Sequence, residues 1–493
     1  MVPQIREFKS SKSPWEIFQA LYRRSDSCFF LDSIRYAPPD QHYSYVAADP
    51  FIEVTIPDPA GKKPRVIVTG AEKISAPAGR VFDVLRRLLR KHRFTGPVSH
   101  PFFCGGAVGY WGYELISLFE RVKFRPKESA GLPWLYLGFF RDVIVYDHRR
   151  KVYALVTHGR RAGEAFQKME EAFQDEGAEA GEAFEIRNFR PGVSRSAFES
   201  RVRRAKNYIA AGDVYQANLS QRFTFDCVGS KLKLYERLRA INPSPFASFF
   251  KVRGVEIISS SPERLVAKRG RMCETRPIAG TRPRVAGRPL SAIKKELLAS
   301  EKERAEHLML VDLERNDLGR VCDWKTVRVE EMMKVEKYSH VLHIVSKITG
   351  RLAKGKDGLD LIRAMFPGGT ITGCPKVRCM EIIDELEPVR RGLYTGSLGY
   401  LDFRGDLDLN IVIRTLVFQG SRGQLQTGAG IVHDSDPGRE YEETLHKGEA
   451  LIQALAEASA LTPRQHGRGQ DFSPVPMARM QDKHLIAGKR VKS

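Results

Sequence analysis

A glycine-rich turn that leads into a helix is the segment of this chain with the clearest chemical potential. It reads Phe-Pro-Gly-Gly-Thr-Ile-Thr-Gly-Cys-Pro-Lys over residues 366–376, and its glycines and prolines exclude a regular helix or a central strand. From Val377 onward apolar residues recur at helical spacing. Such a junction offers backbone N–H groups and the positive end of a helix dipole to an anion. A nucleotide P-loop is excluded, because Cys374-Pro375 stands where a Lys-Ser/Thr pair is required. A plain turn with an amphipathic helix is the alternative.

Charged side chains in apolar segments are further candidates. Arg414 interrupts an apolar strand, where it is either paired internally or reserved for a carboxylate that its planar fork can bind. His343 lies in an apolar alternating segment, where a histidine is more often a satisfied core residue. Glu303 and Glu306 share one helix face, which is by default a solvated stripe. Gln216 lies on the polar face of the alternating segment 215–225, and a face so polar either meets solvent or lines a site.

The elements that must position these residues are strands mixed with helices. We expect a capping box at Ser196-Ala-Phe-Glu199 to open a helix that ends before Gly212. Without a regular βαβ repeat, this mixture indicates an α+β fold. Helices are also expected over about 290–313 and 440–456, and strands around 143–147, 151–156, 215–225, 338–348, 396–401, 408–418 and 424–431.

Length and composition narrow the class of protein. A chain of 493 residues exceeds what one core usually serves, so two large lobes are expected. The seven cysteines are scattered, odd in number and without a Cys-x-x-Cys pair, which fits a reducing cytoplasm and argues against a zinc site or a disulfide framework. We expect neither a signal peptide nor a membrane span.

The net charge of +21 raises the possibility of a nucleic-acid-binding protein, a different class of function. The basic residues are spread along the whole chain, and no nucleic-acid-binding motif accompanies them. A basic surface also attracts small anionic substrates. Nucleic-acid binding is therefore disfavoured.

Several segments around the glycine-rich turn carry a resemblance to a known family. Together they resemble the chorismate-utilising enzymes, namely the large subunits of anthranilate synthase and aminodeoxychorismate synthase, and the isochorismate and salicylate synthases. The resemblance is dense over residues 195–455 and loose over the first 150, and it implies large antiparallel β-sheets sandwiched with outer helices. The segments are Arg276–Pro283, Arg304–Asp312, Tyr394–Tyr400, Ile413–Thr415, Gly428–Val432 and Glu443–Lys447.

The resemblance also divides the chain. It implies an N-terminal anthranilate synthase component I-like region over 1–185 and a chorismate-binding catalytic domain over 194–456. Residues 461–493 are rich in Pro, Gly, Arg and Lys, and we expect them to form a disordered basic tail.

By the same resemblance, two carboxylates hold Mg²⁺, a cation that takes few hard oxygen ligands from protein and keeps water or substrate oxygens. The metal in turn grips the ring carboxylate of chorismate. Glu263 matches the proposed general acid for the C4 hydroxyl, and the family's histidine, here His343, faces the reacting ring. The implied set is Glu306 and Glu443 for the metal, His343, Glu263 and Thr370 for catalysis, and Gly280, Thr281, Tyr394, Arg414, Gly430, Lys447 and Gln216 for substrate binding. Lys447 is alternatively a salt-bridge partner of Glu443.

Gln216 separates members of the family. Isochorismate and salicylate synthases carry a lysine at the matching place, which activates water, and a glutamine cannot act as a base. The chain is therefore expected to use ammonia. It has no Gly-x-Cys-x-Gly nucleophile turn, so the ammonia is expected from a separate glutamine amidotransferase subunit.

The product is either 4-amino-4-deoxychorismate, for the para-aminobenzoate and folate route, or anthranilate, for tryptophan synthesis. Ala279 favours anthranilate, because aminodeoxychorismate synthases often carry a nucleophilic lysine there. Gly396-Ser-Leu-Gly-Tyr400, Phe246-Ala247 and Leu31-Asp32-Ser33, which replaces the Leu-Leu-Glu-Ser signature of tryptophan feedback, favour aminodeoxychorismate. On balance the sequence favours aminodeoxychorismate.

Overall fold

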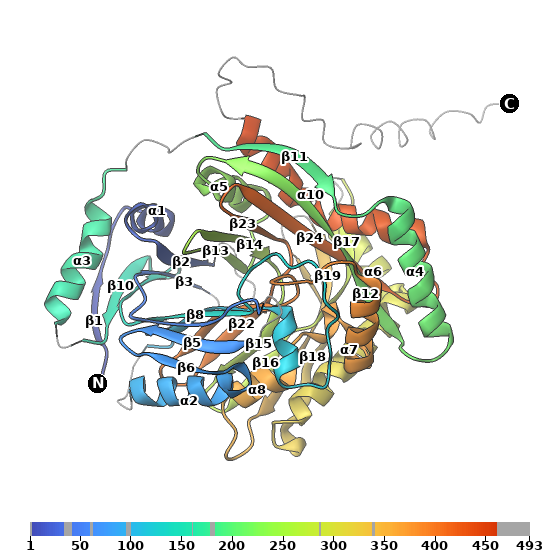
Figure 1. Cartoon of the computed structure of the whole chain (residues 1–493), viewed down its shortest axis with the longest axis horizontal. Helices are drawn as coiled ribbons and strands as arrows, with labels where there is room; N and C mark the ends of the chain where they lie inside the picture. The colour runs from blue at the N-terminus through green and yellow to red at the C-terminus, as the bar shows by residue number, and fades with distance from the viewer. Residues whose placement is uncertain are drawn as a thin grey trace.

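Two large antiparallel β-sheets form the body of the computed structural model (Figure 1), which describes residues 2–33, 42–59, 63–94, 100–159, 161–177, 183–284, 287–337 and 341–460. Within these ranges each sheet has 12 strands. Helices cover the outside of the sheets, so the expected α+β class, with antiparallel sheets and outer helices, is confirmed.

The first sheet contains β1 (Gln4–Phe8), β2 (Ser27–Asp32), β3 (Tyr43–Ala48), β9 (Val143–Asp147), β10 (Val152–Thr157), β11 (Glu185–Pro191), β12 (Gln216–Val228), β13 (Phe246–Val252), β14 (Val255–Ser261), β20 (Gly373–Cys374), β23 (Thr415–Gln419) and β24 (Arg422–Ile431). Its order is β1-β10-β9-β3-β2-β13-β14-β23-β24-β12-β11, and β20 pairs with β12. The expected hairpin of β9 and β10 is present.

The second sheet contains β4 (Ile52–Ile56), β5 (Arg65–Gly70), β6 (Ile74–Pro77), β7 (Gly106–Trp111), β8 (Leu135–Phe140), β15 (Arg264–Arg269), β16 (Met272–Thr275), β17 (Ile278–Pro283), β18 (Arg328–Lys337), β19 (Val341–Arg351), β21 (Ser397–Asp402) and β22 (Leu407–Ile411). Its order is β17-β19-β16-β15-β22-β21-β7-β8-β4-β5-β6, and β18 pairs with β19. Strand β2 pairs with β13 and β7 pairs with β21. The regions 1–185 and 194–456 therefore share both sheets, so the boundary between them divides the sequence but not the fold.

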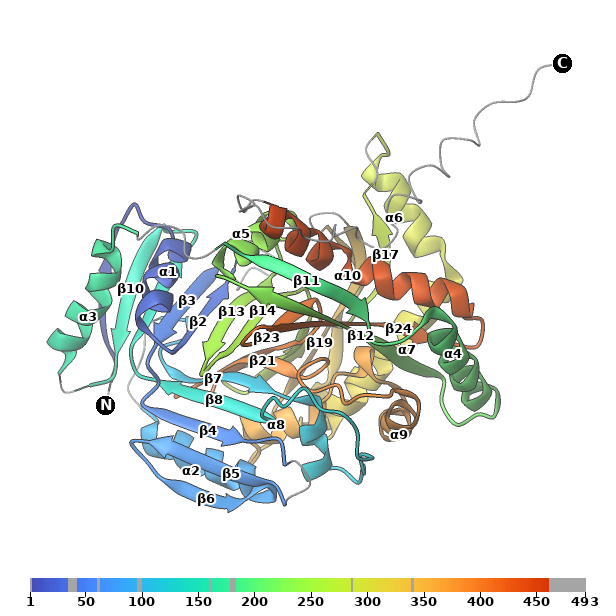
Figure 2. The ribbon, with the colours of Figure 1, turned by 45° about the horizontal axis from the view of Figure 1, so that its top comes forward.

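The helices are α1 (Pro14–Arg24), α2 (Val81–His92), α3 (Ala162–Gln174), α4 (Arg195–Ala210), α5 (Leu232–Ile241), α6 (Leu290–Ala299), α7 (Glu301–Gly319), α8 (Gly358–Met365), α9 (Lys376–Leu386) and α10 (Pro437–Ala460), with 3-10 turns η1 (Ala78–Arg80), η2 (Tyr113–Leu118), η3 (Trp324–Thr326) and η4 (Gly369–Ile371). Helices α1, α3, α5 and α10 pack on the outer face of the first sheet (Figure 2). Helix α7 packs on β17 and β19 of the second.

Alternating side chains of the first sheet build two separate cores. On β2, Phe29 belongs to the core that both sheets share, and Phe30 belongs to the core beneath the outer helices. On β13, Phe250 and Phe249 divide in the same way. This period of two is what a strand that is buried on both faces requires.

The chain passes between the sheets at two places that matter for the site. Between β14 of the first sheet and β15 of the second lies Glu263, and between β22 of the second and β23 of the first lies Arg414. Arg414 has a φ of 50°, and its carbonyl accepts a hydrogen bond from the Ser260 N–H at 3.0 Å. The crossings hold both residues where the two sheets separate.

Three sequence-based expectations about elements need correction. The helix expected over 290–313 is two helices, because Ser300 adopts an extended backbone and caps α7 by accepting from the Glu303 N–H. Helix α4 is capped by Ser194, whose hydroxyl accepts from Ala197, and not by Ser196. The strand expected over 408–418 is broken at Arg414, where the chain changes sheet.

Two other expectations concern the C-terminal tail and membrane spans. The basic tail 461–493 lies outside them. Among the described helices, none has the length and apolar composition needed to cross a bilayer.

Candidate active site

Glu263 is a fully buried carboxyl at the crossing between the sheets, only 4% exposed. Its Oε1 accepts a hydrogen bond from the Ile278 N–H at 3.3 Å. Burial raises the pKa of Glu263 to about 7, although the Thr370 hydroxyl, the Ile278 N–H, Arg414 and Lys447 all favour the anion. A carboxyl that still holds its proton near neutral pH can serve as a general acid.

His343 lies on β19 opposite Thr281 of β17. Its Nδ1 lies 2.9 Å from the Thr281 hydroxyl and 3.3 Å from the carbonyl of Gly280. Burial, together with the nearby cations Arg414 and Lys447, lowers the pKa of His343 to about 3. The imidazole is therefore neutral at physiological pH.

Arg414 and Lys447 supply positive charge to this space, since both act on the pKa of Glu263 and of His343. Lys447 pairs with Glu443 one turn earlier on α10 at 2.7 Å, and it donates to the carbonyl of Gly428 at 3.1 Å. Both alternatives for Lys447 are compatible with its position, because it pairs with Glu443 and its charge also acts on the pKa values of Glu263 and His343. Two cations that act on the same two buried groups suit a substrate with two carboxylates.

Gln216 on β12 and Glu306 on α7 bring two polar side chains into direct contact. The side-chain amide of Gln216, at the start of β12, donates to Glu306 Oε1 at 2.9 Å. A Cβ at residue 430 would lie 2.4 Å from the amide nitrogen of Gln216, so only a glycine leaves room for this contact. The other amide atom, Gln216 Oε1, is buried without a hydrogen-bond partner among the described residues. Such an acceptor fits a donor from a ligand.

Glu306 and Glu443 suit a hard divalent cation by their chemistry. Burial raises the pKa of Glu306, and the negative charges of Glu303 and Glu443 raise it further. A cation would relieve this repulsion. Within the described residues no cluster of three or more His, Cys, Asp or Glu side chains could hold a metal. The two carboxylates would therefore need oxygens from substrate or water to complete a Mg²⁺ site.

Tyr394 is the last of the expected site residues, and its hydroxyl lies near Gly428 of β24. A Cβ at Gly428 would lie 2.7 Å from both the Tyr394 hydroxyl and Asn218 Oδ1, so the three groups are neighbours. The Gly428 carbonyl in turn accepts from Lys447. The twelve residues expected from the sequence are thus brought into one connected region by the described contacts.

Two polar residues near the site were missed by sequence reasoning. Asn218 has a buried Oδ1 without a partner in the described part of the chain, beside Tyr394. Glu314 accepts from the Gly369 N–H at 3.3 Å and from the Thr275 hydroxyl at 3.2 Å. Burial and the charges of Asp317 and Glu263 raise the pKa of Glu314 to about 8, against Lys376. The signal available for Glu314 was its place directly before Arg315-Asn316-Asp317.

Comparisons with known proteins point to one family. Residues 43–453 match the family model described as chorismate binding enzyme. The chain is 46% identical over 366 residues to the aminodeoxychorismate synthase component 1 of Bacillus subtilis, covering 72% of this chain and 78% of that protein. It is 39% identical over 489 residues to the anthranilate synthase component 1 of Streptomyces coelicolor, covering 93% and 90%. The structure of anthranilate synthase component I from Streptococcus pneumoniae TIGR4 superposes with a TM-score of 0.74 at 32% identity, covering 85% of this chain and 94% of that one.

Proposed function

Because the chain belongs to the chorismate-binding enzyme family, we propose that it aminates chorismate with ammonia and forms 4-amino-4-deoxychorismate. In this reaction the C4–O bond of chorismate breaks, a C–N bond forms at C4, and the hydroxyl leaves as water. The ammonia comes from a separate glutamine amidotransferase subunit.

The environment of the Gln216 side chain is the observation that supports ammonia as the nucleophile. Its amide N–H group is used by Glu306, and its carbonyl oxygen is buried with no partner within the described ranges. That oxygen can accept a hydrogen bond from ammonia and orient it. Ammonia, unlike water, needs no strong base before it attacks. Gln216 therefore fits an orienting acceptor better than a base.

The other residues of the site have separate tasks. Arg414 can bind one carboxylate of the substrate through its planar fork. Glu263, which keeps its proton up to about pH 7, gives that proton to the departing hydroxyl. Mg²⁺ held by Glu306 and Glu443 would supply electrostatic binding of the ring carboxylate.

Anthranilate is the second candidate product, and one residue favours it. Ala279 is buried on β17 beside Gly280, and an alanine there cannot form the lysine adduct of many aminodeoxychorismate synthases. Ammonia would then form a C–N bond at C2 while the C4–O bond breaks and the hydroxyl leaves as water, with a shift of the ring double bonds. Loss of the C2 proton to the imidazole of His343 would then break the bond from C3 to the enolpyruvyl oxygen, and the side chain would leave as pyruvate. The similarity to proteins named for each activity is compatible with either product.

The test is incubation of the purified chain with chorismate, Mg²⁺ and an ammonium salt, followed by mass spectrometry and fluorescence. We expect a product that keeps its enolpyruvyl group and yields 4-aminobenzoate only after an aminodeoxychorismate lyase is added. Release of pyruvate together with blue anthranilate fluorescence, without lyase, would establish the second candidate. Glutamine in place of ammonium should give no product from this chain alone.

A further inference from the structure

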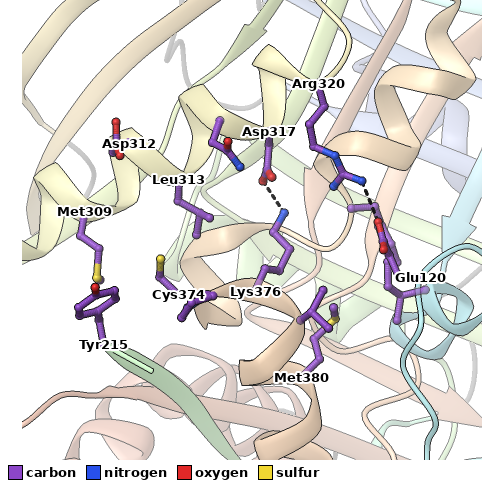
Figure 3. A pocket seen from close by; sticks show the side chains of 15 residues that line it. Glu120, Tyr215, Met309, Asp312, Leu313, Asp317, Arg320, Cys374, Lys376 and Met380 are labelled. Carbon is purple, nitrogen blue, oxygen red and sulfur yellow. Dashed lines mark hydrogen bonds and ion pairs between the residues drawn. The ribbon is translucent and has the colours of Figure 1, made fainter. Parts of the chain in front are cut away.

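Glu314 is a buried carboxyl near the general acid Glu263, and it has no task in the proposed amination. It lies on α7 and is 3% exposed. The cation that acts on it, Lys376, is bonded to Asp317, and Figure 3 shows these two side chains joined. Among the described residues Glu314 itself forms no ion pair. A buried carboxyl without a bound cation is expected to hold a proton.

The hydrogen bonds of Glu314 also favour the protonated form. Its Oε1 accepts from the Gly369 N–H at 3.3 Å. Its Oε2 lies 3.2 Å from the Thr275 hydroxyl oxygen, which in turn lies 2.9 Å from the carbonyl of Leu265. With an ionised Glu314, the single hydrogen of the hydroxyl has to be shared between two acceptors. With a protonated Glu314, the carboxyl O–H donates to the Thr275 oxygen and the hydroxyl donates to Leu265, so both contacts are complete.

On one side, Glu314 fixes the glycine-rich turn. The turn packs so closely on α7 that a Cβ at Gly369 would lie 2.5 Å from Leu313 Cδ2 and 3.4 Å from Glu314 Oε1. The next residue of the turn is Thr370, whose hydroxyl lowers the pKa of Glu263. A shift of the turn along α7 would therefore move a group that sets the pKa of the general acid.

On the other side, Glu314 holds two strands that flank Glu263. Thr275 is the last residue of β16, and three residues later the Ile278 N–H donates to Glu263 Oε1 at 3.3 Å. Leu265, which accepts from Thr275, follows Glu263 by two residues on β15. The carboxyl of Glu314 thus ties to α7 the segments that come before and after the contacts of Glu263.

The charges that face Glu314 agree with a neutral carboxyl. Burial and the negative charges of Asp317, on the same helix, and of Glu263, at the crossing between the sheets, raise the pKa of Glu314 to about 8, while Lys376 of α9 opposes them. The pKa of Glu263 is about 7. Glu263 therefore gives up its proton before Glu314 does, and a neutral Glu314 adds no negative charge next to the anion that forms.

We propose that Glu314 is a positioning residue that acts in its protonated form. It holds the glycine-rich turn, the start of β15 and the end of β16 in place around Glu263, and so sets how readily the general acid gives its proton to the C4 hydroxyl. The inference rests on the proposed role of Glu263 and adds a second carboxyl to the acid side of the site.

Glu314→Gln and Glu314→Leu form a matched pair for the test. The glutamine side chain can accept from Gly369 and donate to Thr275 without an ionisable group, whereas leucine can do neither. With ammonium salts as the nitrogen source, we expect the kcat of Glu314→Gln to stay within about threefold of wild type. The kcat of Glu314→Leu should fall at least about tenfold, with the KM for chorismate within about threefold. Chorismate consumption is measured, so the result does not depend on which product forms.

The pH profile separates positioning from a simple loss of folded protein. Thr370 and Ile278 both favour the anion of Glu263, so loosening them should raise its pKa. The decline of kcat expected near pH 7 should then move at least about half a pH unit higher in Glu314→Leu, and stay at the wild-type position in Glu314→Gln. If Glu314→Leu does not fold, Thr275→Val removes the contact from the strand side and should shift the profile in the same direction.

Two results would overturn the proposal. A folded Glu314→Leu enzyme with the kcat and pH profile of wild type would show that Glu314 positions nothing. A loss of about tenfold or more in Glu314→Gln would show that the enzyme needs the charge or the proton of Glu314 itself.

Denaturant unfolding tests the protonation of Glu314 independently of activity. The pKa of about 8 in the folded chain, against an ordinary value of 4.5, means that the folded state keeps a proton which the unfolded state loses as the pH rises between these values. Wild-type stability should therefore fall over this window relative to Glu314→Gln. A difference in midpoint that does not change with pH would contradict the protonated form. A wild-type chain that consumes no chorismate would reject the proposed function, and the unfolding comparison would still decide the protonation of Glu314.

Discussion

Glu263 and Arg264 are neighbours in the chain, yet they belong to two buried polar clusters of opposite character. Glu263 faces the site, where Gln216 and Asn218 each have a buried oxygen without a partner among the described residues. Arg264 faces the other way. Its guanidinium makes two hydrogen bonds of 3.0 Å to Asp408.

The cluster around Arg264, which we call the paired cluster, comprises Arg264, Asp408, Glu274, Arg269, Tyr400, Asp32 and Arg239. Arg264 also bonds Glu274 at 2.7 Å, and Arg269 bonds the Tyr400 hydroxyl at 2.6 Å. At the other end, Arg239 bonds Asp32 at 2.7 Å. The cavity beside these groups measures about 60 Å³. Every one of these charges is neutralised by a protein partner.

The two clusters therefore differ in function. The first contains polar groups available to bind a ligand, and the second contains ion pairs that stabilise the fold. Buried polar atoms in proteins are nearly always hydrogen-bonded, so an orphaned one points to a missing partner. The site has such orphans, whereas the charged groups of the paired cluster have ion-pair partners. Substitutions should accordingly damage activity in the first and stability in the second.

The largest effect is expected at the proposed metal carboxylates. Glu306→Gln or Glu443→Gln should lower kcat/KM at least about 100-fold at ordinary Mg²⁺ concentration, because each removes a charge from the cation site. Thermal unfolding should show little change, and for Glu306→Gln a small gain is compatible with the loss of a repelled charge. Steady-state kinetics across a Mg²⁺ titration measures the effect.

Glu449→Gln is the control for Glu443, since it removes an exposed carboxylate from the same helix. Wild-type turnover in either metal-site variant would remove that residue from the site and weaken the contrast between the clusters.

In the paired cluster the expected loss is one of stability. Asp408→Asn leaves the buried guanidinium of Arg264 without its bidentate partner, which should cost about 3–5 kcal/mol in free energy of unfolding. Denaturant unfolding measures this, and kcat per folded molecule should remain near that of wild type. An Asp408→Asn variant that keeps its stability but loses activity would contradict this and show that Asp408 acts in the site.

The pH dependence of Glu263 offers a finer test. Its pKa is about 7 in the folded chain against an ordinary value of 4.5. The folded state thus holds an extra proton between these values, and its stability falls as the pH rises through this window. Glu263→Gln should remove that fall and gain up to about 3 kcal/mol relative to wild type at pH 8, while kcat drops sharply.

Wild-type kcat should itself decline as the pH rises through about 7, because the general acid loses its proton. An activity profile that is flat from pH 6 to pH 9 would contradict this role for Glu263.

The smallest effect concerns tryptophan. The 60 Å³ cavity is far below the roughly 300–1,000 Å³ typical of ligand pockets, and the carboxylate of Asp32 is already bound by Arg239. We expect millimolar tryptophan to leave the initial rate unchanged. Inhibition competitive with chorismate or a tryptophan-induced rise in Tm would show that the paired cluster can open.

The sequence predicted the chemistry of single residues better than their spatial relations. The types of Gln216 and Arg414, set in segments of contrasting pattern, were enough to nominate them, whereas Glu263 was nominated only by the family resemblance. The passage of the chain from one sheet to the other at Arg414 was not predictable. The apolar strands before and after Arg414 have the same sequence pattern whichever sheet they join. Glu314 was missed for a related reason, since a glutamate on a charged helix is by default exposed, and only the tertiary packing of the glycine-rich turn buries it.

The shared sheets have a practical consequence for dividing the protein. A fragment limited to residues 194–456 would lose the neighbours of β13 and β21 together, since β2 and β7 belong to the N-terminal region. Both strands would then present long, largely apolar edges with unpaired N–H and C=O groups, which recruit other chains and aggregate. The catalytic region therefore needs residues 1–185 to remain soluble, and limited proteolysis of the intact protein should release no stable catalytic fragment.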